Sequence, residues 1–232
     1  ELLPMIRQIE RLRPHQIETV LAERSLIYLP LGTIEWHCHH LPVGLDALTA
    51  HGLCLRAAER TGGLVWPALY YGTGGDHGDF PWTVMMPDTA EIETLLTFTL
   101  RRLCDLGVKE AVLFSGHFAD TQLEMIDRIA ENWNAMGRQP SAKALAVNGA
   151  SVPDFPPDHA GPFETTLLDG VEPGLSDLGR LSTDADLAPR FHPGSPLWGI
   201  VGADPRQAAV MEPASLVQVI TDWVEREVGV RG

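Results

Sequence analysis

One short stretch of the chain, PLGTIEWHCHHLPVGLD (residues 30–46), holds an unusual density of groups that can bind a metal ion. Its histidines and carboxylates are Glu35, His37, His39, His40 and Asp46. Glu35 and His37 are two positions apart, so in an extended backbone both side chains point to the same side. Asp46 follows a Pro-Gly turn that could fold it back towards them. An imidazole and two carboxylates suit Zn²⁺, Mn²⁺ or Fe²⁺, and one carboxylate of such a set could bridge two ions.

Three other segments place a histidine beside glycine or proline. LFSGHFADTQ (113–122) carries His117, GTGGDHGDFPWT (72–83) carries His77, and DHAGPFETT (158–166) carries His159 and Glu164 on a predicted Pro-Gly loop. The glycine-rich segment 72–83 lacks the GxxxxGK[ST] pattern, which argues against a phosphate loop. Each segment alone is more typical of a structural histidine than of a functional one.

The surrounding apolar patterns predict the elements that must position these groups. Buried-strand runs occur at 25–32, 109–117 and 143–149, and 64–72 is typical of a strand and loop. Helical spacing predicts helices at 47–62, 89–107, 121–137 and 214–228. Strands that alternate with helices favour an α/β fold with a mainly parallel sheet, whose ligands bind beyond the carboxyl ends of the strands. The loops 33–46 and 115–120 both follow a predicted strand, so we expect them at one rim of the sheet.

Bulk composition limits the classes of function. The 232 residues carry a net charge of −14, which argues against a nucleic-acid or anionic-membrane partner. Three cysteines without a CxxC pair favour a reducing compartment, and no signal-peptide pattern or apolar run of about 18 residues is present, so we expect a cytoplasmic protein. No break in composition divides the chain, and we predict a single domain over residues 1–232. The proline-rich segment 150–210 predicts only short regular elements.

Taken in order, the four segments resemble the signatures of one family, the creatininase-like amidohydrolases. GTIEWHCHHLPVGLD is similar to the signature Gly-x-x-Glu-x-His-Gly-x-His-Leu-Pro-x-x-x-Asp, with Cys38 in place of the usual glycine. DHGDFPWT resembles a His followed by Phe-Pro-Gly-Thr, with Trp82 in place of glycine. SGHFAD resembles Asn-Gly-His-Gly-Gly-Asn, and HAGPFETT resembles His-Ala-Gly-x-x-Glu-Thr-Ser. The resemblance covers roughly residues 25–166.

The resemblance implies a single three-layer α/β domain, with a mainly parallel sheet flanked by helices, that binds two divalent metal ions (Zn, Mn or Fe). The family commonly forms homohexamers, so a homo-oligomer is expected. Carried over residue by residue, it makes Glu35, His37, Asp46 and His117 metal ligands, with Asp46 as the bridge. Creatininase takes its fifth ligand from the position of Ala119, which cannot bind a metal. Other members use the glutamate that matches Glu164, which we assign here, while Asp120 is a substitute outside the family pattern.

The remaining groups are predicted to act around the ions. His159 has the type and the signature position of a proton shuttle to the leaving group. His40 matches a histidine that orients a ligand, and His39 replaces a variable position that could face the pocket. The predicted pocket or supporting residues are therefore His39, His40, His77, Asp79, Phe118 and Asp120.

These residues predict a metal-dependent hydrolase in which a two-metal-activated water attacks a small cyclic amide or related carbonyl substrate. Creatinine is not expected, because Ala119 replaces a ligand and because Phe155 and Pro156 stand where creatininase carries a Trp-Asp pair. Two alternatives remain open at this point. One is hydrolytic C–C cleavage of a cyclic polyol ketone, which the polar His39 and Asp79 would suit. The other is a metal-stabilised binding protein without turnover.

Overall fold

A four-stranded parallel sheet forms the centre of the molecule in the computed structural model, which describes residues 6–147, 158–207 and 211–229. The strands are β1 (Leu26–Leu31), β2 (Leu64–Val65), β5 (Glu110–Ser115) and β6 (Ser141–Ala146), in the order β2-β1-β5-β6. Every residue of β1 is buried, because helices cover both faces of the sheet. Two short strands, β3 (Gly72–Thr73) and β4 (Met85–Met86), pair with each other in a separate two-stranded parallel sheet.

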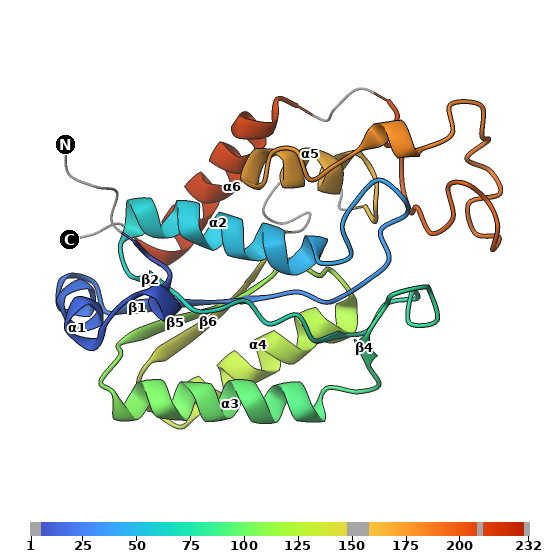
Figure 1. Ribbon diagram of the computed structural model, residues 1–232. Coiled ribbons are helices and arrows are strands. Elements are labelled where there is room, and N and C mark those ends of the chain that lie inside the picture. The colour runs from blue at the N-terminus through green and yellow to red at the C-terminus, as the bar shows by residue number, and fades with distance from the viewer. Residues whose placement is uncertain (1–5, 148–157, 208–210, 230–232) are drawn as a thin grey trace.

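The helices form a layer on each face of this sheet (Figure 1). Helices α2 (Leu45–Thr61), α5 (Pro162–Val171) and α6 (Pro213–Val228) pack on one face, around the buried side chains of Phe114 and Phe163. Helices α3 (Ala90–Asp105) and α4 (Asp120–Ala135) pack on the other, around Trp133 and Leu113. Helix α1 (Pro14–Glu23) lies beside β2, and two 3₁₀ turns cover Ile9–Arg11 and Leu178–Arg180. The predicted α/β architecture with a parallel sheet between helices is confirmed.

The order of the strands explains why the site lies where it does. From β1 the chain passes to β2 on one side and later returns to β5 on the other. The loop after β1 and the loop after β5 therefore run in opposite directions. They leave a crevice between them, beyond the carboxyl ends of the two strands, as in other open parallel sheets. Register places Leu31 opposite Ser115, so both strands end at the same level.

Helix α5 corrects one prediction from the sequence. Residues 158–166 were expected to form a loop, yet Pro162 begins a ten-residue helix that carries Glu164 in its first turn. Proline is compatible with the first turn of a helix, where its missing N–H has no partner to lose. Eight of the ten residues of α5 are buried, so its sequence lacks the broad polar face of a surface helix.

Two further points concern the described residues and the lengths of the helices. Residues 148–149 of the predicted third strand, together with Phe155 and Pro156, lie outside the described residues. None of the helices in the described parts is both long and apolar enough to span a membrane.

Candidate metal centre

Asp46 occupies the first turn of α2, where it is 1% exposed. Glycines at the ends of β1 and β5 let the helix start this close to the sheet. A Cβ atom on Gly32 would lie 2.1 Å from the backbone nitrogen of Ala47, and one on Gly116 would lie 2.1 Å from the carbonyl oxygen of Asp46. Any side chain at either strand end would therefore push Asp46 out of place.

A first group of potential ligands joins the two strand-end loops to α2. The Nδ1 atom of His117 lies 3.1 Å from Oε2 of Glu35 and 3.2 Å from Oδ2 of Asp46. All three side chains are buried. The other ring nitrogen of His117 lies 3.2 Å from the carbonyl oxygen of Gly74 and can donate its proton there. This contact leaves the Nδ1 lone pair facing the carboxylates, as in the hydrogen-bonded histidines of metal sites.

A second group shares Asp46 with the first. The Nε2 atom of His37 lies 3.1 Å from Oδ1 of Asp46 and 3.6 Å from Oε2 of Glu164. Its Nδ1 atom donates to the backbone oxygen of Glu35 at 3.0 Å, so Nε2 faces the carboxylates. Within each group the potential ligand atoms lie within 4.8 Å of one another. Asp46 thus directs one oxygen to each group.

The hydrogen bonding of these atoms tests whether the residues fit metal ions. Four buried atoms have no well-directed hydrogen bond despite their close approach, namely Oε2 of Glu35, Nε2 of His37 and both carboxylate oxygens of Asp46. Buried polar atoms are normally hydrogen-bonded, and unpaired buried carboxylates are costly. Lone pairs that converge from imidazoles and carboxylates suit one divalent cation in each group, so the residues fit two ions.

The raised pKa values of His37 and His117 show that the carboxylates of this cluster stabilise positive charge. Burial alone would lower the pKa of His37, but the charges of Asp46 and Glu164 outweigh it and raise the pKa to about 10. Burial also opposes the charged form of His117, and the carboxylates of Asp46 and Glu35 still raise its pKa well above the usual range. Metal binding would satisfy the same carboxylates and release protons from the two imidazoles.

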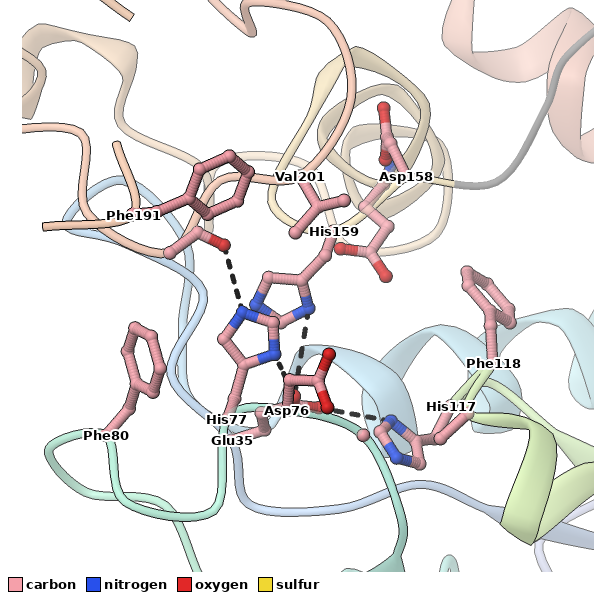
Figure 2. A pocket seen from close by; sticks show the side chains of 14 residues that line it. Glu35, Asp76, His77, Phe80, His117, Phe118, Asp158, His159, Phe191 and Val201 are labelled. Atoms are coloured by element: carbon pink, nitrogen blue, oxygen red, sulfur yellow. Dashed lines mark hydrogen bonds and ion pairs between the residues drawn. The ribbon is translucent and has the colours of Figure 1, made fainter. Parts of the chain in front are cut away.

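His159 and His77 lie next to the first group (Figure 2). The His159 ring stacks between His77 and His37, with ring centroids 3.8 Å and 4.3 Å away. Its Nε2 atom donates to the backbone oxygen of Trp36 at 2.7 Å, and its Nδ1 atom lies 3.8 Å from Oε1 of Glu35. Burial and the nearby His37 hold the pKa of His159 well below its usual range, so its Nδ1 atom is available to accept a proton.

The first turn of α5 holds Glu164 in place. Oε2 of Glu164 accepts a hydrogen bond from the backbone N–H of Ala160 at 2.7 Å. The Asp158 carboxylate accepts from the N–H groups of Phe163 and Glu164, at 2.8 and 3.2 Å, and so caps the helix. Burial raises the pKa of Asp158 to about 6. His40 supports the same turn, because its Nε2 atom contacts the Thr165 hydroxyl at 3.2 Å.

A cavity of about 510 Å³ opens onto this cluster. Six of the predicted site residues line it, namely Glu35, His77, His117, Phe118, His159 and Glu164. His37, His40 and Asp46 are buried behind the cavity wall. Burial lowers the pKa of His40 to about 4, with smaller contributions from His37 and His39.

Three predicted pocket residues lie elsewhere. His39 is exposed, with its ring edge-on to Trp36 at 4.9 Å. Asp79 and Asp120 are exposed and do not line the cavity. His39 and Asp79 lie on irregular backbone, where the sequence does not determine which way a side chain points, and Asp120 begins α4 with its side chain exposed.

Other lining residues were missed from the sequence, namely Asp76, Phe80, Asp158, Phe191 and Val201. Asp158 could have been found from its position next to His159. Phe191 and Val201 belong to an apolar stretch without a motif, so only the fold brings them to the site.

Comparison with known proteins identifies the family. Residues 10–227 match the profile described as Creatininase: Creatinine amidohydrolase. The chain is also similar to the creatinine amidohydrolase of Pseudomonas putida, with 31% identity over 70% of each chain. The protein therefore belongs to the creatininase family, as its sequence motifs predicted.

Further relatives differ in what their names describe. The mycofactocin precursor peptide peptidase of Mycolicibacterium smegmatis is 29% identical, over 87% of this chain and 85% of the relative. Among solved structures, a creatinine amidohydrolase superposes with a TM-score of 0.76 and 25% identity, over 97% of both chains. A structure named Creatininase Mn gives a TM-score of 0.75 and 25% identity, over 96% of this chain and 97% of the other.

Two departures from the family signatures, Cys38 and Trp82, lie on backbone that glycine would adopt more easily. Cys38 has φ 57° and Trp82 has φ 59°, in the left-handed region that glycine adopts most easily. Both stand where the signatures carry glycine. The loops thus adopt a glycine-like turn without the glycine.

Proposed function

We propose that this chain is a two-metal hydrolase that cleaves an amide bond in a small substrate other than creatinine. The observation that carries the proposal is the position of Asp46, whose two unpaired oxygens face two separate groups of imidazole and carboxylate ligands. The proposed ligands are Glu35, His37, Asp46, His117 and Glu164. Solved structures of creatininase include one named for Mn and one named for a Zn–Zn pair, which supports the choice of divalent ions.

The chain's own residues would divide the work of hydrolysis. When bound, the ions supply Lewis acidity and a water of lowered pKa. The Nδ1 atom of His159 accepts a proton and returns it to the leaving nitrogen, as a general base and then a general acid. Contacts with Trp36, His77 and His37 hold the ring of His159 in one orientation.

The amide substrate is favoured over the alternatives. The relatives are named as a creatinine amidohydrolase and as peptide peptidases, and both names describe cleavage of a C–N bond. The polyol-ketone alternative depended on His39 and Asp79 as pocket groups, and both lie outside the cavity. A purely structural metal site would be closed, whereas here a cavity reaches Glu35, His117 and Glu164.

Ala119 supports a substrate other than creatinine. It lines the cavity at the position from which creatininase takes a carboxylate ligand, and its methyl group cannot replace that ligand. Glu164 would supply the carboxylate from α5 instead.

Metal removal tests the proposal. Chelator-treated protein should lose activity and regain it with Zn²⁺, Mn²⁺ or Fe²⁺, and elemental analysis should count two ions per chain. The substrates to compare are creatinine, other cyclic amides, short peptides, lactones and cyclic ketones. Full activity in metal-free protein, or efficient turnover of creatinine, would contradict the proposal.

The family resemblance also supports a homo-oligomer, with six copies as the expected number. Sedimentation of the purified protein at several concentrations measures this number directly.

A further inference from the structure

The cavity beside the candidate metal centre has apolar walls. In Figure 2, Phe80 and Phe191 lie to the left of the clustered imidazoles, Val201 lies above His159, and Phe118 lies to the right near His117. Phe191 is 63% exposed and Val201 is 42% exposed, although both face a concave site. Exposed apolar side chains in such a place are typical of a binding surface.

The segment that carries Phe191 and Val201 is fixed to the site itself. Nε1 of Trp36 donates to the carbonyl oxygen of Trp198 at 2.9 Å, and Nε2 of His77 lies 3.1 Å from that of Gly199. His159 and Val201 exchange two backbone hydrogen bonds, at 3.0 and 2.9 Å. Because these bonds come from three different site loops, the apolar wall has a defined position relative to the proposed ligands.

The charged residues that line the cavity outside the proposed ligand set are acidic. Among the described lining residues, Asp76 and Asp158 carry carboxylates outside the proposed ligand set, and none is a lysine or an arginine. Arg190 does not line the cavity; its guanidinium packs over the Phe191 ring at 4.6 Å and donates to the carbonyl oxygen of Leu187. The described residues that line the cavity therefore offer no cation of their own to a substrate carboxylate.

We infer that the cavity takes a substrate with an aromatic or branched apolar group beside its scissile amide, and no carboxylate on that group. The inference rests on the proposed function, because it places the amide at the metal centre. The volume of about 510 Å³ lies in the range of pockets for drug-sized ligands, so it accommodates a group of this size in addition to the amide. The apolar group would cover the exposed faces of Phe191 and Val201.

Hydroxamates test this inference by binding, without any need for turnover. A hydroxamate chelates a metal ion, so its side chain samples the wall next to the centre. On metal-loaded protein, calorimetry should give phenylacetohydroxamate an affinity about 10- to 100-fold higher than acetohydroxamate, the gain expected from burying one aromatic ring. The 4-carboxyphenylacetohydroxamate should lose most of that gain.

Two phenylalanine variants provide the matched comparison. Phe191→Ala should reduce the preference for the phenyl compound at least about fivefold and leave the affinity for acetohydroxamate unchanged, and Val201→Ala should act in the same direction. Phe98→Ala is the control, because Phe98 lies on α3, is similarly exposed at 59%, and does not line the cavity.

The outcomes separate this inference from the proposed function. Equal affinities for the two hydroxamates, an unchanged preference in Phe191→Ala, or a carboxylate that strengthens binding would overturn the inference and leave a two-metal hydrolase standing. If no hydroxamate binds metal-loaded protein, the proposed metal centre is wrong, and the inference is overturned with it.

Discussion

Glu35 and Glu164 are both buried carboxylates at one centre, yet their pKa values move in opposite directions. Burial would raise the pKa of Glu35, but the imidazoles of His117 and His77 lie within 3.2 Å and lower it well below the usual range. Burial raises the pKa of Glu164 well above the usual range, and His37 only partly opposes this effect. Because both side chains are buried, the difference between the two pKa values comes from their neighbours: Glu35 faces the imidazoles of His117 and His77, whereas Glu164 has the imidazole of His37 and the carboxylates of Asp46 and Asp158 nearby.

The difference follows from the elements that carry the two glutamates. Glu35 belongs to a loop fixed by the ends of β1 and β5, where the first ligand group is complete within the sheet edge and α2. Glu164 reaches the centre from the first turn of α5, a helix that Asp158 caps and that packs against α2 and α6 rather than on the strand ends. We expect the strand-end group to be the more rigid half of the site and the helix group to be the more easily disturbed.

The largest expected effect is that of Asp46→Ala, because Asp46 serves both halves. The variant should lose at least one ion and nearly all activity, measured by elemental analysis and by amide hydrolysis. Asp120→Ala is the matched control, since Asp120 is an exposed aspartate in the first turn of α4. Loss of metal in the Asp120 variant, rather than in the Asp46 variant, would show that the wrong carboxylate has been assigned.

The pair Glu164→Gln and His159→Ala separates a ligand from a proton carrier. Glu164→Gln keeps the shape and removes the charge, so it should weaken only the second ion, by about 100-fold or more, since losing even an outer partner costs about 10–100-fold. His159→Ala should keep both ions and lower kcat by about 10²–10⁴. If Glu164→Gln retains two tightly bound ions while His159→Ala loses one, the roles are reversed.

Gly116→Ala probes the rigid half through its backbone. The added Cβ would lie 2.1 Å from the carbonyl oxygen of Asp46, so we expect a loss of about 3 kcal/mol in the free energy of unfolding, at the upper end for overpacking. Denaturant titration measures it. Gly78→Ala should change little, because its Cβ meets no atom within 4 Å. Similar stability of the two variants would mean that α2 does not depend on contact with the strand ends.

Asp158→Ala should have the smallest effect, confined to the helix half. It removes a carboxylate that caps α5, which typically costs about 1 kcal/mol of stability. The second ion should weaken with it, while the first stays bound. Competition with a metal-sensitive dye gives the two affinities, and equal weakening of both ions would mean that α5 does not act on one half alone.

The rigid half could be predicted from the sequence because its signals are local. Apolar runs end in glycine at 32 and 116, and the predicted ligands Glu35 and His117 follow within a few residues. A parallel sheet brings such strand ends to one edge without further information.

The apolar wall could not be predicted, because contacts between distant parts of the chain create it. Trp36 and Trp198 are 162 residues apart in sequence, and His77 and Gly199 are 122 apart. Neither pair belongs to a motif, and no periodicity in the segment around Phe191 indicates its position. Helix α5 was missed for a related reason, since burial of eight of its ten residues leaves no broad polar face to reveal it.

The left-handed residues Cys38 and Trp82 have a consequence for how such sites diverge. A side chain in this conformation costs roughly 1–2 kcal/mol more than glycine, and both loops sustain that cost within a folded chain. The left-handed torsion angle at these two signature positions therefore does not require glycine. Distant members of this family could escape a search for residues and still be recognised by the shape of these two turns.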